Sequence, residues 1–323
     1  MLVAELHHEL VGVIQGSIKR VTIKNQARVG YILGLRVAPF YRHKGIGLSL
    51  VKHLEEWFIT NQVDFAYMAT DKDNLGSVKL FTDKLGFIKF RTPTILVNPV
   101  GLRKSRISPT VEIAKLKIED AELLYRRFMG STEFFPDDID RVLRNKLSLG
   151  TWVAYPITES WGDINSGQFP PNWAMLSVWN SGDLFKLRVD KAPLSCFMYA
   201  KSSRLIDRVF PCLKIPVFPD VFRPFGFYFM YGLNQHGPRS GLLVRSLCRF
   251  VHNMAMEFEE DCKVIVTEVG GCDSLSLNIP HWKLLSCEDL WCIKGLRKET
   301  QDSLFELTKT LTSRDLFVDP REV

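Results

Sequence analysis

The sequence predicts an α/β protein of two domains, each with a mixed sheet flanked by helices. Apolar stretches of strand length alternate with amphipathic stretches of helix length. The 323 residues also fit two domains of ordinary size. Charge divides the chain in the same way, because residues 1–110 carry 16 basic and 8 acidic side chains, whereas residues 111–323 carry 26 and 28. We therefore expect a first domain at 1–100, a linker at 101–110 and a second domain at 111–323.

Composition excludes several classes of protein. A hydrophobic content of 46% and a charged content of 24% argue against disorder and coiled coil. The longest apolar stretch, Phe225 to Leu233, is too short to span a bilayer. No signal peptide is evident, and the seven cysteines form no CxxC pair, so they indicate reduced thiols. We expect an intracellular protein, nuclear and/or cytoplasmic, that is not secreted and binds no membrane or metal.

The first domain is predicted to alternate strands and helices. Residues 30–37 are a continuous apolar run typical of a central strand, and Pro39 ends it. Residues 46–58 have apolar side chains at helical spacing, and Gly86 closes a second helix. The expected order is strand 2–6, turn His7-His8, β-rich stretch 9–23, strand 30–37, helix 46–58, strand 63–70, helix 74–84 and strand material 87–97.

The second domain is predicted in the same way. We expect strand 111–116, helices 119–128 and 137–147, strand 225–233, helix 239–257 and strand 264–269. Residues 173–180 and 184–189 are expected to form a hairpin through Ser181-Gly182.

An internal echo relates the two parts. Ile32-Leu33-Gly34-Leu35 matches Met230-Tyr231-Gly232-Leu233 at an offset of 198, and a helix follows each. Either the second part is a diverged copy of the first, or the echo is what any strand–turn–helix–strand unit would give. A copy predicts that strands 225–233 and 264–269 are parallel, with the helix between them.

The sharpest motif is the segment LRVAPFYRHKGIG at residues 35–47. A strand ends at a proline, and Arg42-x-x-Gly45-x-Gly47 then opens a helix. A helix N-terminus offers unpaired N–H groups and roughly half a positive charge, which suits a pyrophosphate. The glycines allow phosphates to approach the backbone, and Arg42 and Lys44 add charge.

These residues resemble the GNAT-type acyl-CoA N-acyltransferases. Arg42, Gly45 and Gly47 match one family motif, while Asn74-x-x-Ser77 and Leu85-Gly86-Phe87 match the next. More narrowly, the chain is similar to the plant hookless-type N-acetyltransferases, through LFTDKLGFIKFRTPTILVNPV (80–100), PFGFYFMYGL (224–233) and IPHWKLLSCEDLWCIK (279–294). The resemblance implies a GNAT-type fold, a second diverged GNAT-like domain, and a role in plant growth control such as hypocotyl elongation.

The resemblance also implies a site and a reaction. Acetyl-CoA would lie between two splayed strands, and a protein amine, from a lysine or an α-amine, would attack its thioester. Histone or another nuclear protein is the implied acceptor. The cofactor-binding residues would be Leu35, Arg36 and Val37 along the pantetheine arm, Arg42, His43, Lys44, Gly45, Ile46 and Gly47 at the pyrophosphate, and Asn74 and Ser77 on the following helix. Asn74 also reads as a helix N-cap.

Three departures from the family pattern stand out. The position of the usual tyrosine acid holds Phe81, with one residue more than usual before Gly86. The first strand and two helices of the family are missing ahead of the hairpin, so we expect a truncated first domain. The echo in the second domain has Leu243 and Arg245 where the glycines would be, so we expect no CoA there.

A general base is less clear from the sequence. Tyr31 shares one face of its strand with Val37 and is our candidate proton relay, although a core tyrosine is the alternative. The rival function is a non-catalytic regulator that keeps the CoA fold and acts through protein contacts. Direct nucleic-acid binding is not expected, because basic and aromatic residues do not interleave in the first domain.

Overall fold

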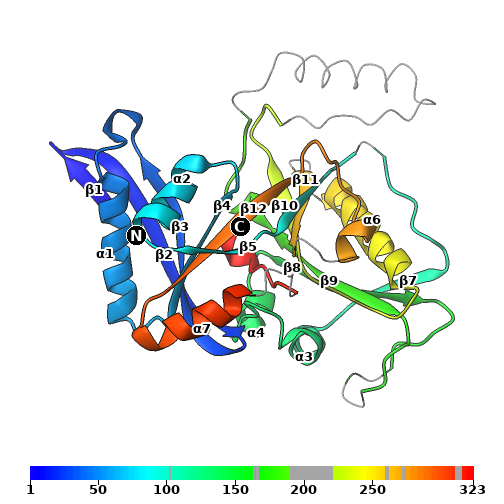
Figure 1. Cartoon of the computed structure of the whole chain (residues 1–323). Helices are drawn as coiled ribbons and strands as arrows, with labels where there is room; N and C mark the ends of the chain where they lie inside the picture. The colour runs from blue at the N-terminus through cyan, green and yellow to red at the C-terminus, as the bar shows by residue number, and fades with distance from the viewer. Residues whose placement is uncertain are drawn as a thin grey trace.

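The fold is one mixed sheet covered by helices on both faces (Figure 1). A computed structural model describes residues 1–101, 103–162, 164, 167–189, 221–258, 262–270, 274–309 and 315–323. Its described strands form a sheet of 12 in the order β1-β2-β3-β4-β12-β6-β11-β10-β9-β8-β7, with β5 beside β12. We call residues 1–100 the N-terminal half and residues 111–323 the C-terminal half.

The strands are β1 (Leu2–Leu6), β2 (Glu9–Ile23), β3 (Asn25–Val37), β4 (Phe65–Asp71), β5 (Ile88–Arg91), β6 (Thr94–Pro99), β7 (Val111–Lys115), β8 (Ser148–Pro156), β9 (Trp173–Asn180), β10 (Gly226–His236), β11 (Cys262–Val269) and β12 (Cys287–Gly295). The α-helices are α1 (Ile46–Thr60), α2 (Leu75–Lys79), α3 (Ile118–Met129), α4 (Ile139–Leu143), α6 (Ser240–Phe258) and α7 (Lys298–Lys309).

The N-terminal half forms as its hydrophobic pattern predicts. β2 and β3 pair antiparallel over almost their whole length, and β3 then pairs parallel with β4. Between them α1 buries Leu50, Val51, Leu54 and Phe58 against the sheet, so its apolar stripe makes the crossover. The chain enters α1 through the short helix η1 (Pro39–Tyr41) after Pro39 ends β3.

The C-terminal half repeats this order. β8, β9 and β10 pair antiparallel, and β10 pairs parallel with β11 across α6. The parallel pairing predicted for strands 225–233 and 264–269 is therefore confirmed. That the C-terminal half is a diverged copy of the N-terminal half remains a proposal.

The two halves exchange a strand. β12 lies late in the chain but pairs antiparallel with β4, placing Gly295 opposite Phe65. β6 lies early in the chain but pairs antiparallel with β11, placing Pro99 opposite Val264. A short pairing of β12 with β6 joins the two parts into one sheet. A strand from each side of the predicted boundary at 101–110 therefore pairs with strands from the other side. The division into two domains stays a prediction.

A matching β-bulge interrupts β3 and β10. Gly34 and Leu35 together face Ile14 alone, with Gly34 at φ 64°. Gly232 and Leu233 together face one residue of β9 in the same way, with Gly232 at φ 59°. Glycine suits such a bulge because it adopts positive φ without strain. Parallel pairing ends at the bulge in both halves, after Ile32 with Met68 and after Met230 with Thr267.

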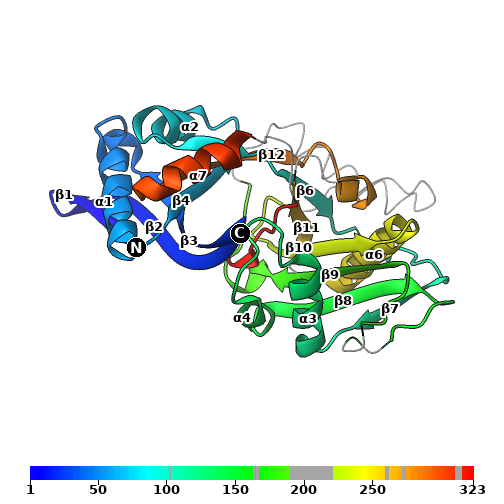
Figure 2. The same cartoon turned by 60° about the horizontal axis from the view of Figure 1, so that its bottom comes forward.

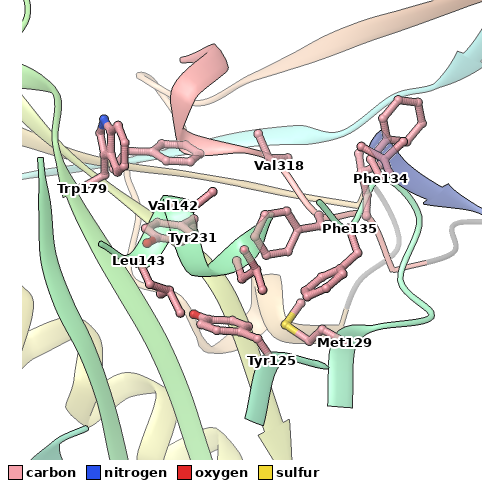
Figure 3. Close-up of a cluster of buried hydrophobic side chains, with 14 of the residues drawn as sticks. Tyr125, Met129, Phe134, Phe135, Val142, Leu143, Trp179, Tyr231 and Val318 are labelled. Carbon is pink, nitrogen blue, oxygen red and sulfur yellow. The ribbon is translucent and has the colours of Figure 1, made fainter. Parts of the chain in front are cut away.

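The main core lies between the two halves, on the sheet face opposite α1 and α6. Its aromatic and aliphatic side chains come from α3, α4, the strands and the C-terminal segment, and they include Tyr125, Phe134, Trp179, Tyr231 and Val318 (Figure 3). The C-terminus lies in the middle of the molecule, between the halves, in both views of the cartoon (Figure 2).

Buried ion pairs hold the C-terminal segment in that place. Lys19 lies 2.7 Å from Glu322, and the Tyr67 hydroxyl donates to Glu322 at 2.5 Å. Burial alone would raise the pKa of Asp319, but the charges of Lys19 and Arg321 lower it to about 2.

Three sequence predictions need correction here. The helix expected at 137–147 is limited to α4, Ile139–Leu143, and turns follow it up to β8. Residues 184–189 are not the hairpin partner of 173–180; a 3-10 turn, η3 (Ser181–Asp183), leads the chain away, and Leu187 forms a bridge with Phe225. The helix expected at 74–84 is α2 followed by a π-helical segment, η2 (Leu80–Lys84). A π segment accommodates one extra residue, which explains the extra residue before Gly86. Cys248, Cys262, Cys287 and Cys292 are free thiols, and the other three cysteines lie outside the described residues.

Candidate functional site

A groove of about 1180 Å³ opens where β3 and β4 separate. Its walls come from β3, the loop into α1, β4, α2 and the start of η2. Because β3 and β4 pair only as far as Ile32 and Met68, the edge of β3 beyond the bulge faces the groove without a strand partner. Leu35, Arg36 and Val37 lie on this edge and line the groove.

The N-terminus of α1 forms one end of the groove. Gly45 is its N-cap, and no side chain caps the helix. Ser49 makes the first intrahelical bond, to the Gly45 carbonyl, so the N–H groups of Ile46, Gly47 and Leu48 have no acceptor one turn earlier. A Cβ at Gly47 would lie 3.6 to 3.9 Å from side chains of Val37, Leu80 and Leu35. These donors therefore face a space that glycine leaves open.

The groove is positive. Among the described residues that line it, Arg36, Arg42 and His43 bring basic side chains, and none is acidic. Arg42 is exposed, and its Nε donates to the Val37 carbonyl at 3.1 Å, which fixes the guanidinium beside the helix start. Lys44 does not line the groove; its ammonium lies 5.1 Å from the centre of the Tyr41 ring. A helix N-terminus with these cations is suited to a phosphate group.

Comparisons with known proteins agree with this geometry. The profile of the Acetyltransferase (GNAT) family matches residues 1–87. The Arabidopsis thaliana protein named "Probable N-acetyltransferase HLS1-like" is 47% identical over 359 residues, covering 100% of this chain and 86% of that protein. The chain belongs to the GNAT acetyltransferase family. Membership makes it an acetyltransferase by class.

Two further matches extend this result. "Acetyl transferase GW6a" from Oryza sativa subsp. japonica is 36% identical over 336 residues, covering 100% of this chain and 77% of that protein. The Saccharomyces cerevisiae N-myristoyltransferase, solved with bound myristoyl-CoA, aligns with a TM-score of 0.51 at 10% identity. That alignment covers 89% of this chain and 64% of the yeast chain, and at this identity it shows a shared fold alone.

The second GNAT motif lies across the groove from α1. The Asn74 side chain accepts from the Ser77 amide at 3.3 Å and caps α2, as its alternative reading predicted. Its Nδ2 also donates to Thr70 at 3.2 Å. Asn74 and Ser77 both line the groove, so the capping role leaves them beside the space that a pantetheine arm would occupy.

Phe81 lines the inner end of the groove where the family pattern expects a tyrosine. Its ring is 1% exposed and meets the edge of Phe87 at 5.1 Å between ring centres. Neither ring has a proton to give to a leaving thiolate. Phe81 therefore cannot act as the general acid that the family pattern expects at this position.

Tyr31 lies on the far side of the sheet from α1, not in the groove. It is 8% exposed, and its ring stacks on Tyr67 at 4.7 Å between centres. Burial, followed by the charges of Glu322, Glu268 and Asp289, raises the pKa of Tyr31 well above its ordinary value. The structure thus separates Tyr31 from the loop residues that the sequence grouped with it, and places it among carboxylates instead.

Among the described residues, little space remains at the equivalent place in the C-terminal half. Between β10 and β11 the cavity measures about 20 Å³. A Cβ on Gly232 would lie 2.4 Å from the Tyr125 hydroxyl, so α3 fills this side. Just ahead of α6, Asn172 accepts from the Arg239 amide at 3.1 Å, and the Asn278 side chain lies 2.8 Å from where a Cβ on Gly241 would stand, so side chains cover the start of the helix.

Sequence reasoning missed Glu268 and Asp289. Glu268 follows Val264 and Val266 at a spacing of two, so strand periodicity alone places this carboxylate on a core-facing side. That signal was present in the sequence. The pairing that brings Asp289 near it depends on the strand exchange, which no local pattern indicates. Within the described ranges, no group of three or more potential metal ligands occurs, and no helix is long and apolar enough to cross a bilayer.

Proposed function

We propose that the chain binds acetyl-CoA in the groove between β3 and β4 and transfers the acetyl group to a primary amine of a protein. The observation that carries this proposal is the uncapped N-terminus of α1, which opens onto the unpaired edge of β3. The pyrophosphate would bind the amides of residues 43–47, with Arg42 and Lys44 nearby. The pantetheine arm would follow Leu35 to Val37, with Asn74 and Ser77 on its other side.

The chain's own groups account for binding and positioning. Backbone N–H groups at the bulge beside Gly34 would polarise the thioester carbonyl, since the parallel pairing that would otherwise use this edge has ended. Holding the thioester and the amine in one place supplies a large part of such catalysis. A lysine side chain or an α-amine is the proposed acceptor, with histone or another nuclear protein as its source and plant growth control as the role.

A specific observation favours the rival function, a CoA-binding regulator without catalysis. Phe81 cannot supply the proton that the departing thiolate needs. Titration with acetyl-CoA, followed by a search for acetyl transfer to protein amines, distinguishes the two functions. The regulator binds acetyl-CoA and transfers nothing.

The test of the binding site is Gly47→Glu. A Cβ at this position meets only ordinary contacts, at 3.6 Å or more, so the variant should fold. Its carboxylate would repel a pyrophosphate, and we expect calorimetric affinity for acetyl-CoA to fall by at least about 100-fold, or ~2.7 kcal/mol. Ser49→Glu is the matched control, because Ser49 is exposed on the same helix outside the groove. Unchanged affinity in Gly47→Glu would overturn the assignment.

A further inference from the structure

Three of the described side chains that line the groove carry a hydroxyl group, those of Tyr41, Thr70 and Ser77. The Tyr41 hydroxyl donates to Glu9 at 3.0 Å, so its proton is already in a hydrogen bond. Ser77 lies in the first turn of α2, on the wall that the pantetheine arm would follow. Thr70 lies on β4, half-buried, just beyond the point where β3 and β4 separate. Of the three, Thr70 is the one carried by a strand that forms the opening.

The register of the sheet places Thr70 across the groove from the bulge of β3. Ile32 and Met68 are the last pair of the parallel ladder between β3 and β4. Two residues further along the two strands lie Gly34, at the bulge, and Thr70. Side chains alternate along a strand, so Thr70 points to the same side as Met68, which packs in the core under α1. The proposed site polarises the thioester carbonyl at the bulge, and Thr70 therefore lies on the opposite wall from the reacting group.

The hydrogen bonds of Asn74 determine the role of the Thr70 hydroxyl. Asn74 Oδ1 accepts from the Ser77 amide at 3.3 Å, so Nδ2 is the atom of this side chain that faces Thr70. Nδ2 donates to Thr70 Oγ1 at 3.2 Å, which makes the hydroxyl oxygen the acceptor. Among the described residues, the Thr70 side chain makes no other hydrogen bond. A hydroxyl has one proton to donate, and that of Thr70 is therefore left for a group in the groove.

We infer that the Thr70 hydroxyl donates a hydrogen bond to the sulfur of CoA and stabilises the thiolate that leaves during acyl transfer. This inference rests on the proposed function, because it takes the CoA sulfur to lie in this groove. Thr70 then supplies, from β4, a donor that Phe81 cannot supply from the helix. The hydroxyl acts by electrostatic stabilisation, since it can donate a hydrogen bond without giving up its proton.

The acyl transfer balances without a proton from Thr70. The neutral amine attacks the thioester carbonyl carbon, a C–N bond forms, and the C–S bond breaks. The electron pair of the C–S bond stays on the sulfur, where the Thr70 O–H group faces the new negative charge. The nitrogen loses one proton to solvent, and the thiolate takes one proton from solvent. The products are an amide and CoA with a free thiol.

The surroundings of Thr70 suit this task. The edge of β4 away from β3 pairs with β12, which places Thr70 opposite Leu290, while Asn74 holds the hydroxyl oxygen from α2. A donor fixed in this way stabilises a developing charge without having to rearrange. Phe81 lines the same groove and is 1% exposed, so an apolar ring lies at its inner end. A hydrogen bond is electrostatically stronger in such apolar surroundings than in water.

The test measures binding and requires no turnover. CoA and desulfo-CoA, which lacks the sulfur atom, are titrated calorimetrically into the full chain at pH 7 and at pH 10, on either side of the ordinary pKa of a thiol. We expect the affinity of CoA relative to desulfo-CoA to rise at least about fivefold from pH 7 to pH 10, or ~1 kcal/mol, because an ionised sulfur is the stronger acceptor. Protein groups that titrate in this range act on both ligands, so the ratio of the two affinities isolates the sulfur.

Variants assign this rise to the Thr70 hydroxyl. Thr70→Val keeps the shape of the side chain and lacks the hydroxyl, so the rise should disappear, whereas Thr70→Ser should keep it. Thr82→Val is the matched control, because the Thr82 hydroxyl is hydrogen-bonded to the Val78 carbonyl at 2.9 Å and does not line the groove. Every variant leaves in place the basic side chains of the groove, those of Arg36, Arg42 and His43.

The outcomes separate this inference from the proposed function. If the unmodified chain binds neither ligand, the proposed function fails and this inference fails with it. If the chain binds both ligands and their affinity ratio is the same at the two pH values, the inference alone is overturned. A rise that persists in Thr70→Val, with CoA and desulfo-CoA weakened equally, would also overturn it and would show that Thr70 only holds Asn74 in place.

Discussion

Glu268 shows how one buried carboxylate can link stability to pH. Its folded pKa of about 8 lies well above the ordinary value of an exposed glutamate. Between these two values the folded state holds a proton that the unfolded state has released. Glu268 therefore makes the protein less stable as pH rises through this range, and the effect levels off above pH 8.

Replacing this carboxylate should remove the effect. We compare the free energy of unfolding of Glu268→Gln with that of the unmodified chain. The difference in favour of Glu268→Gln should increase by more than ~1.4 kcal/mol, the value of one pKa unit, from pH 5 to pH 9. Urea unfolding of both proteins at the two pH values measures the change. The same stability difference at pH 5 and pH 9 would show that Glu268 is already ionised in the folded protein.

Residues of the loop that leads into α1 could be predicted because their signal is local. Arg42, Gly45 and Gly47 stand together in the sequence, and the structure places them at one end of the groove. Strand periodicity alone made Tyr31 a candidate proton relay. The residues that surround it could not be predicted from the sequence. Its neighbours Glu268 and Asp289 lie more than two hundred residues away along the chain and meet it only through β11 and β12.

The bulges of β3 and β10 have the same backbone conformation, but the side chains that pack around them differ. A Cβ on Gly34 would have nothing within 4 Å, whereas one on Gly232 would lie 2.4 Å from Tyr125. Tyr125 is fully buried, and its hydroxyl is hydrogen-bonded to Ser177 at 2.7 Å, so it cannot easily move.

Alanine at the two positions should separate backbone strain from crowding. Gly34→Ala should cost ~1–2 kcal/mol through its positive φ. Gly232→Ala should cost at least ~1–3 kcal/mol more, as overpacking does. Urea unfolding of the two variants measures both costs. Equal losses would mean that the space beside Gly232 is not closed by Tyr125.

Elements with strong local patterns were predicted well, and the exceptions have physical reasons. β3, α1 and α6 have continuous apolar runs or stripes, and they form near the predicted residues. β12 was missed because its buried side chains face both sides of the sheet, which hides the alternation of a strand. The hairpin at 173–189 failed because both edges of β9 are taken, by β8 and β10.

The strand exchange ties the two halves together through pairing between strands of both. Without β12, the edge of β4 that faces away from β3 would have no antiparallel partner, and without β6 the edge of β11 would have none. We therefore expect that residues 1–110 and residues 111–323, produced separately, do not fold cooperatively. Mixed together, the two fragments should recover a single unfolding transition. A cooperative transition in residues 1–110 alone, together with acetyl-CoA binding, would show that the halves are independent.

Hydrogen–deuterium exchange of the full chain, with and without acetyl-CoA, tests the central claim that the N-terminal half, and not the C-terminal half, binds the acyl donor. The N–H groups at the start of α1 lack an acceptor in the helix, whereas Asn172 accepts from the Arg239 amide just before α6 and the Asn278 side chain lies against Gly241 in its first turn. We predict that acetyl-CoA slows exchange at residues 34–37 and 43–48 and leaves residues 239–245 unchanged. No protection at 43–48, or protection at 239–245, would contradict the account.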